Sequence, residues 1–243
     1  MKKLVFNAFF VCIALASQAQ VSDGSKIGIT TGRGLTGLRS DAFATAATPP
    51  SEVKGDFYAD SVWQTGGVKF QKAIPQIGGG ESDSLAGIQI RYNVLNNELE
   101  VLADEKKNDV RVIKGGMLRS FSLDGSPGAS FINVATLQPG SLTGFGEVLS
   151  SGKTMLIKHF RTRITKPNYN PGFATGEKNT IVRIDHDYYA ATGNSLKKLD
   201  LGKKLPEAFA DQKQQAEKYA KDNALNLKKE EDVVRLFDFI NGK

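Results

Sequence analysis

The stretch FGEVLSSGKTMLIKHF, Phe145 to Phe160, decides the fold class because it permits two opposite interpretations. Gly152-Lys153-Thr154 matches the end of a phosphate-binding loop, which also needs a glycine five residues earlier and a helix directly afterwards. The earlier position holds Glu147, a negative charge where phosphates would lie, and the run after Thr154 favours a strand. The stretch therefore predicts a β-hairpin, with Glu147–Leu149 as the first arm, Ser150–Gly152 as the turn and Thr154 opening the second arm.

The same strand pattern extends on both sides of this hairpin, from Gly55 to about Asp200. Apolar and polar residues alternate in short runs separated by Gly, Asn, Asp and Pro turns, and no helical pattern interrupts them. Strands without crossover helices form an antiparallel sheet, and a meander, an open barrel and a sandwich remain open. The predicted strands are Trp63–Phe70, Leu85–Asn93, Glu98–Asp104, Val110–Ile113, Met117–Leu123, Phe131–Val134, Phe145–Leu149, Thr154–Ile164, Thr180–Tyr189 and Ser195–Leu199.

A helical pattern replaces the strands after Leu201. Two helices are predicted between about 205 and 241, the second from Lys229 to Asn241 with acidic residues in its first turn. We expect this pair to cover the sheet or a barrel mouth, with a partner-binding helix as the alternative. The fold class is therefore α+β: a predominantly antiparallel sheet with two C-terminal helices packed on it, in a single domain from 53 to 243. The apolar residues that should pack are Leu205, Phe209, Ala216, Tyr219, Ala220, Val233, Leu236, Phe237 and Ile240.

The first residues carry an export signal. Lys2 and Lys3, an apolar run, and small residues up to Ala19 predict a signal peptide over residues 1–19, cleaved near Ala19, and hence a periplasmic or secreted protein. Cys12 is the only cysteine and lies inside that run, without the residues that precede a lipidated cysteine. No lipid anchor, disulfide or thiolate metal site is therefore expected.

Residues 20–52 are predicted to form a flexible lead segment, because Gly, Ser, Thr and Ala bury too little surface to offset the entropy of ordering. Within it, Gly32–Gly37 has the spacing of a dinucleotide fingerprint, but no alternation of strands and helices follows, so no cofactor is expected. No later segment is apolar over the ~20 residues of a membrane helix. The net charge of +6 on an exported chain gives no reason to expect nucleic acid as a partner.

Charged residues of two predicted strands form the candidate site. Because side chains alternate along a strand, Phe160 and Ile164 should mark the core side of the hairpin's second arm, while Ile157, His159, Arg161 and Arg163 share the opposite, exposed face. In the strand from Thr180, Arg183, Asp185 and Asp187 also share one face, and pairing of the two strands would set arginines against carboxylates. The candidate surface residues are Arg161, Arg163, Arg183, Asp185 and Asp187.

Catalytic and metal-binding roles find little support in the same residues. His186 points away from Asp185 and Asp187 on a strand, so the three cannot hold one ion, and a hydrogen-bonded histidine on an apolar face is expected. The two aspartates stand ~7 Å apart on one face, a spacing that a pair of catalytic carboxylates can use. No catalytic nucleophile motif accompanies His159 or His186.

Several landmarks together resemble a family of uncharacterised exported proteins from Bacteroidota-type Gram-negative bacteria. They are Gly55-Asp56-Phe57-Tyr58 with Trp63, Ile90-Arg91-Tyr92-Asn93, Glu147-Val148-Leu149 with Gly152-Lys153 and Leu156-Ile157-Lys158, Asp187-Tyr188-Tyr189, and Glu230-Glu231-Asp232. The resemblance covers about Gly55 to Lys243 and leaves out the lead segment. It implies a periplasmic or secreted protein with a β-rich body and C-terminal helices, and it implies no activity or site residue.

Three functions remain open from the sequence. The first is a non-enzymatic exported module that binds another envelope or secreted protein. The second is a binder of an apolar or glycan ligand, with Trp63, Tyr92, Tyr188 and Tyr189 as lining, although aromatic residues in a β-rich body more often form its core. The third and weakest is a hydrolase built on Asp185 and Asp187.

Overall fold

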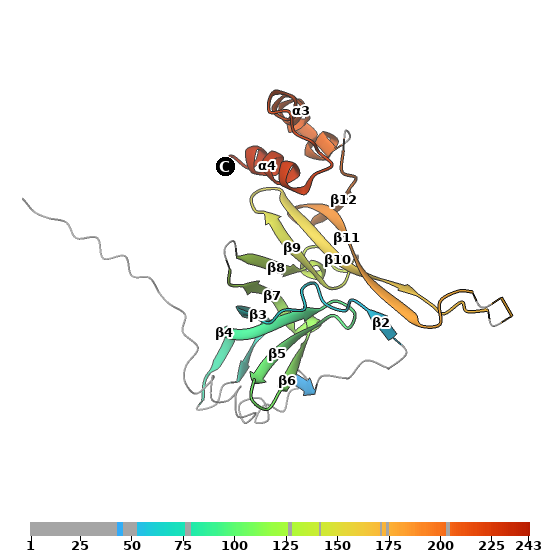
Figure 1. Cartoon of the computed structure of the whole chain (residues 1–243). Coiled ribbons are helices and arrows are strands. Elements are labelled where there is room, and N and C mark those ends of the chain that lie inside the picture. The colour runs from blue at the N-terminus through green and yellow to red at the C-terminus, as the bar shows by residue number, and fades with distance from the viewer. Residues whose placement is uncertain are drawn as a thin grey trace, which may run out of the picture.

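The computed structural model describes residues 43–45, 53–75, 79–125, 128–140, 142–170, 172–173, 175–202 and 205–243. Within these ranges a long, mostly antiparallel sheet leads into two C-terminal helices (Figure 1), which confirms the α+β fold class. The predicted signal peptide over residues 1–19 lies outside the described residues. So does the lead segment over residues 20–52, except for Phe43–Thr45, which form a short strand.

The strands of the described residues join into one twelve-stranded sheet in the order β1-β6-β5-β4-β3-β7-β8-β9-β10-β11-β12, and β2 adds a parallel pairing to β11. Their bounds are β1 Phe43–Thr45, β2 Val53–Gly55, β3 Gln64–Pro75, β4 Glu81–Asn93, β5 Glu98–Asp104, β6 Asp109–Lys114, β7 Leu118–Leu123, β8 Ala129–Asn133, β9 Phe145–Ser150, β10 Met155–Thr165, β11 Thr180–Thr192 and β12 Ser195–Leu199, with 3₁₀ turns η1 Gly115–Met117 and η2 Val134–Thr136. Every predicted strand is present. Only β1 and β2 escaped prediction, because three residues are too few to show a period of two.

β7 returns to pair with β3 instead of continuing outward from β6, and the sheet curls so that the strands on either side of β3 face each other. Strands β4 to β6 and β7 to β9 therefore contribute side chains to one shared apolar cluster. Aromatic rings join the two halves: Tyr92 of β4 meets Phe145 of β9 edge-on at 5.2 Å between ring centres and lies 5.7 Å from Phe121 of β7. The lower body in Figure 1 is thus a curled sheet around an apolar cluster, from which β10 to β12 continue away.

The C-terminal segment forms η3 Leu205–Gln212, α3 Lys213–Asp222 and α4 Glu230–Ile240. The second predicted helix is confirmed, whereas the first begins as a 3₁₀ helix: the Leu205 N–H donates to the Gly202 carbonyl, three residues back, at 3.0 Å. Leu205, Phe209, Ala216, Val233, Leu236 and Phe237 are buried together with Leu156, Ala190 and Leu199 of the sheet. The helical pair therefore covers the sheet, as expected, rather than presenting an open apolar face.

The predicted β9–β10 hairpin is confirmed, with Lys158 directly opposite Glu147. Its turn is held by the end of α4, because Asn241 accepts the Thr154 N–H at 3.1 Å and donates to the Thr154 carbonyl at 2.9 Å. Gly152 has a φ of +149°, and a β-carbon there would collide with the Asn241 side chain. The glycine that suggested a nucleotide loop is therefore needed for the close approach of a helix end.

The expected faces of β10 are only partly right. Leu156 is fully buried and Phe160 packs against the core, but Ile164 is 54% exposed, and Ile157 and His159 on the expected outer face are buried. The cause is the length of β10. Its first half is covered on both faces by the body and the helices, whereas its second half projects beyond them with β11 as an arm (Figure 1).

Candidate functional site

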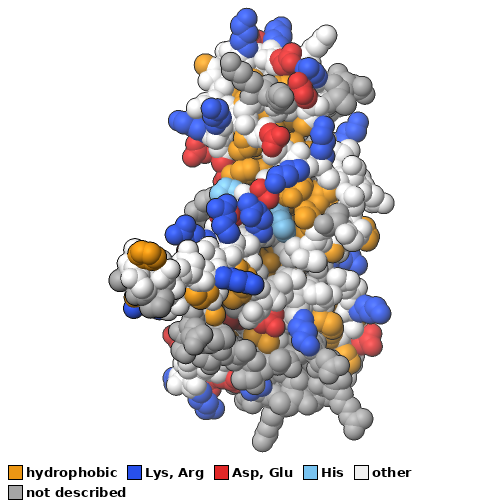
Figure 2. All heavy atoms as spheres, turned by 90° about the vertical axis from the view of Figure 1, so that its right-hand side faces the viewer, with side chains coloured by type: hydrophobic (Ala, Val, Ile, Leu, Met, Phe, Trp, Pro, Cys, Tyr) orange, Lys and Arg blue, Asp and Glu red, His pale blue; other side chains and the backbone are white. Residues whose placement is uncertain are grey.

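The predicted charged residues gather on one face of the β10–β11 ribbon. The two strands pair without a register shift, which sets Arg161 opposite Asp185 and His159 opposite Asp187. Arg161 contacts both carboxylates, with Nε to Asp187 at 3.0 Å and a guanidinium nitrogen to Asp185 at 3.4 Å. Figure 2 shows these acidic and basic side chains together near the middle of one side of the molecule.

Further cations complete this charged face. Arg163 reaches Asp185 at 2.8 Å, and Lys198 of β12 reaches Asp187 at 3.1 Å. The pKa of Asp187 is lowered because, although burial raises it, the hydrogen bond from Lys198 and the charge of Arg161 outweigh that effect. Asp187 is therefore held as an anion between cations and is not available as a catalytic acid, while Asp185 is engaged by Arg161 and Arg163.

Arg183 departs from the predicted arrangement. It lies directly opposite Arg163 rather than opposite a carboxylate, and its side chain is exposed. Among the described residues no ion pair reaches it. The face therefore holds four cations, Arg161, Arg163, Arg183 and Lys198, against two carboxylates.

A hollow of about 580 Å³ lies beside the first part of this face, which we call the edge hollow. Its volume is in the range of ligand pockets, about 300–1,000 Å³. It is lined by Tyr92, Val94, Leu95, Asn97, Ala135, Gly140, Leu142–Gly144, His159–Thr162, Asp187 and Tyr189. Two of the aromatic residues proposed as ligand lining, Tyr92 and Tyr189, are thus at the hollow, whereas Trp63 and Tyr188 are elsewhere.

His159 fixes one wall of the edge hollow. Its Nε2 lies 2.8 Å from the Thr143 carbonyl and must donate to it, so Nδ1 carries the lone pair; Nδ1 is buried and has no hydrogen-bond partner among the described residues. Burial lowers the pKa of His159 more than the carbonyl and Asp187 raise it. The ring is therefore neutral and connects β10 to the loop at Thr143. Because it is buried, it is not accessible to a substrate as a general base.

Tyr92 fixes the opposite wall. Its hydroxyl accepts the Phe145 N–H and donates to the Asn97 side-chain oxygen, both at 3.2 Å. Burial raises the pKa of Tyr92 to about 12, so the phenol stays neutral and keeps donating at physiological pH. Asn97 itself takes the left-handed conformation, with φ of 53°, in the predicted turn between β4 and β5.

The opposite face of the ribbon is anchored to the helices. Glu230 at the start of α4 accepts from Tyr188 at 2.5 Å and pairs with Lys158 at 2.9 Å. Burial tends to raise the pKa of Glu230, but the hydrogen bonds from Tyr188 and Lys158 outweigh it and hold the pKa below its usual value. The acidic first turn predicted for this helix therefore acts as a clamp on the sheet.

His186 lies on this second face, away from both aspartates as predicted. It is exposed, and its ring meets Tyr188 edge-on at 5.3 Å. The expectation of a hydrogen-bonded histidine is wrong for His186 and fits His159 instead. With Lys158, Phe160 and Ile184, His186 lines a second hollow of about 530 Å³ whose other wall is Gly55–Ser61.

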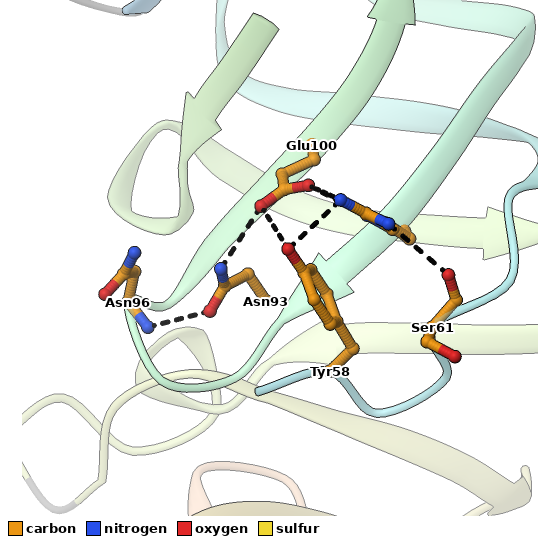
Figure 3. A network of polar contacts seen from close by, with 6 residues as sticks. Tyr58, Ser61, Asn93, Asn96 and Glu100 are labelled. Atoms are coloured by element: carbon orange, nitrogen blue, oxygen red, sulfur yellow. Dashed lines mark hydrogen bonds and ion pairs between the residues drawn. The ribbon is translucent and has the colours of Figure 1, made fainter. Parts of the chain in front are cut away.

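Trp63 packs beside a polar network within the body, in which Figure 3 shows Tyr58 and Asn93 directed at Glu100. The Arg91 guanidinium is stacked between the rings of Trp63 and Tyr58, each at 4.2 Å from the ring centre. It pairs with the buried carboxylate of Glu100 at 2.7 Å, and Glu100 also accepts from Tyr58 at 3.0 Å and Asn93 at 3.2 Å. The network satisfies one buried charge, so Trp63 is a structural residue rather than part of a ligand platform.

The described residues contain no group of three or more His, Asp, Glu or Cys side chains that could hold a metal ion. In the same part of the chain no helix has both the length and the apolar character needed to cross a bilayer. Comparison of the chain with protein-family models, with curated proteins and with solved structures gives no match.

Proposed function

We propose that this chain is an exported, non-enzymatic module that binds another envelope or secreted protein through the β10–β11 arm. One observation carries the proposal: two of the three large apolar side chains exposed in the described residues, Ile164 at 54% and Phe173 at 79%, lie on this arm. The arm projects from the body in Figure 1 and points toward the viewer in Figure 2. A bound protein would bury these two side chains, and aromatic residues and arginine, both present on this arm, are enriched in protein interfaces.

The chemistry at the ribbon also supports binding over catalysis. Asp185 and Asp187 are engaged by arginine and lysine, and His159 uses its one N–H on a backbone carbonyl. A hydrolase would need a carboxylic acid or a free base facing the substrate. The export part of the proposal rests on the sequence of residues 1–19 and on the family resemblance.

The arm is tested by site-specific photo-cross-linking in the native envelope. A photoreactive phenylalanine analogue replaces Phe173, and the same analogue at Val62, which is 62% exposed outside the arm, is the control. We expect a discrete cross-linked protein from position 173 and none from position 62, with a lower yield when Ile164→Ser is added. Absence of a product at position 173, or equal products at both positions, contradicts the proposal.

The proposed export from the cytoplasm is tested separately. Cell fractionation should find the full chain in the periplasm or medium without residues 1–19, and a chain lacking those residues should stay in the cytoplasm. A cytoplasmic location of the full chain would overturn the export proposal whatever the arm binds.

A second candidate is a small-molecule binder, which the edge hollow favours through Tyr92 and Tyr189. Native mass spectrometry of the protein purified from its own envelope would show a bound small molecule of constant mass. Tyr189→Ala should remove that mass if the hollow is the site.

A further inference from the structure

We propose that the outer edge of β10, from Phe160 to Thr165, takes up an extended segment of the partner protein as an additional strand, and that this segment alternates acidic and apolar side chains. The inference rests on the proposed function and names its mode of recognition, which is β-strand addition.

The first observation is an edge without a partner. β10 pairs with β11 over its whole length, from Met155 to Thr165, but β9 pairs with it only from Leu156 to His159. Among the described residues no other backbone hydrogen bond reaches the outer side of Phe160–Thr165. Alternate residues of this stretch therefore direct N–H and C=O groups outward, which is the template that an added strand needs.

The second observation is space along that edge. Phe160 and Thr162 lie on one face of β10, and His159 and Arg161 lie on the other, yet all four line the edge hollow. A hollow that touches both faces of a strand lies beside the strand and not over one face. Leu142–Gly144 form part of its lining, and Thr143 is held by His159 at 2.8 Å.

The third observation is charge. On one face of the free stretch stand Arg161 and Arg163, with Arg183 directly across from Arg163. Like charges directly opposite on a sheet are destabilising, and an acidic side chain on a neighbouring strand would relieve them. On the other face Ile164 is largely exposed, so an apolar side chain at the next position of an added strand would cover it.

The same charges disfavour a second copy of this chain as the occupant. Suppose that a second copy paired antiparallel along this edge, with the same face outward and Thr162 opposite Thr162. Arg161 of each copy would then lie opposite Arg163 of the other. Repulsion between arginines at the edge is a common device against self-association of sheets. The edge thus discriminates in favour of an acidic strand from another protein.

The test uses a fluorescently labelled seven-residue peptide of alternating Glu and Val, titrated with the full mature chain and followed by anisotropy. Two peptide controls are a Lys–Val version and a Glu–Val version methylated on every second backbone nitrogen, which keeps the side chains and removes strand hydrogen bonds. Protein variants are Arg163→Glu and, as a matched control, Arg119→Glu, which replaces an exposed arginine of β7.

We expect the methylated peptide and the Arg163→Glu variant each to weaken binding by about tenfold. Arg119→Glu should bind like the wild type, and Arg163→Glu should gain affinity for the Lys–Val peptide. Hydrogen exchange should show slower exchange of amides between Phe160 and Thr165 when the Glu–Val peptide is bound.

Equal binding of the methylated peptide, or no effect of Arg163→Glu, overturns strand addition. So does full competition by glutarate, which would assign the arginines to a small anion, or dimerisation of the chain through this edge.

These outcomes are separable from failure of the proposed function. A cross-link at Phe173 with no strand-dependent peptide binding leaves the protein-binding function standing without this mode. If the Glu–Val peptide binds by strand addition but position 173 gives no cross-linked protein, the arm is not the site at which a native partner binds.

Discussion

Arg163 of β10 lies directly opposite Arg183 of β11, at the point where the ribbon leaves the body of the protein. Of these two arginines, only Arg163 has a carboxylate in contact within the described part of the chain, Asp185 at 2.8 Å, and Arg161 shares that carboxylate. A pair of like charges facing each other across a ladder costs stability in the free protein. The protein therefore carries two like charges in contact range at an exposed position of the ribbon, which is unfavourable for its stability.

Replacing Arg183 by Glu should turn this repulsion into attraction. We expect Arg183→Glu to raise the free energy of unfolding by up to about 1 kcal/mol, less at high salt, because the pair is solvent-exposed. Urea unfolding at low and high salt measures the change, with Arg119→Glu as the control. A loss of stability in Arg183→Glu would show that Arg183 has a stabilising contact.

The buried Glu100 carboxylate should make its arginine far more important than a comparable surface pair. Arg91–Glu100 and Arg111–Asp109 are both 2.7 Å long, but the carboxylates are 5% and 28% exposed. We expect Arg91→Met to cost about 3 kcal/mol or more, because it leaves a buried charge unpaired, and Arg111→Met to cost about 1 kcal/mol or less. Equal losses in urea unfolding would contradict a role for burial. Partial recovery in Arg91→Met/Glu100→Gln would support it.

Glu230 should clamp α4 to the sheet in a pH-dependent manner. Its pKa is below the usual 4.5, so its contribution is fully present above about pH 4.5 and is lost as the pH falls through the lower pKa of the folded state. Glu230→Gln should cost about 1 kcal/mol at neutral pH and progressively less in acid. Glu231→Gln, an exposed neighbour in the same helical turn, separates this effect from that of the helix dipole. A difference between Glu230→Gln and wild type that grows in acid would contradict the assignment.

His159 should make the protein less stable below about pH 6.5. Because burial lowers its pKa in the folded state from the usual 6.5, the unfolded chain takes up a proton first, and stability falls as the pH drops from 6.5 toward the folded-state pKa. His159→Gln should remove this dependence while its amide N–H can still donate to the Thr143 carbonyl. The protein has one other histidine, the exposed His186, so His186→Gln is the control and should keep the wild-type profile.

Much of the fold could be predicted because its signals are local. Glu98–Asp104 and Ser195–Leu199 form strands with the predicted bounds, since a period of two between turns is a property of neighbouring residues. The first helical segment begins at Leu205, close to the predicted start, but its 3₁₀ form could not be predicted, because that depends on hydrogen bonding that begins at Gly202 and not on the spacing of apolar residues. The signal peptide, which also rests on a local pattern, stays a prediction.

The sequence predicted which residues form the candidate site, but it did not predict how all of them are arranged. The alternation of Arg161, Arg163, Asp185 and Asp187 placed them on matching faces, and pairing of the strands then brings them together. The register that sets Arg183 against Arg163 could not be read from either strand alone, because it depends on where the connection between them begins and ends. No local signal marked His159 as buried, since the loop at Thr143 that covers it is distant in sequence.

The sequence by itself determined that this chain forms an antiparallel sheet followed by two helical segments, and that Gly152-Lys153-Thr154 belongs to a hairpin and not to a nucleotide loop. Those conclusions depend on periodicity and on the charge of Glu147, both of which are local. Only the tertiary structure decided that β10 extends beyond its pairing with β9, so that no strand among the described residues pairs with its outer edge from Phe160 to Thr165, beside a hollow. Strand length relative to a neighbour and burial by distant loops arise from packing of the whole chain, which no short stretch encodes.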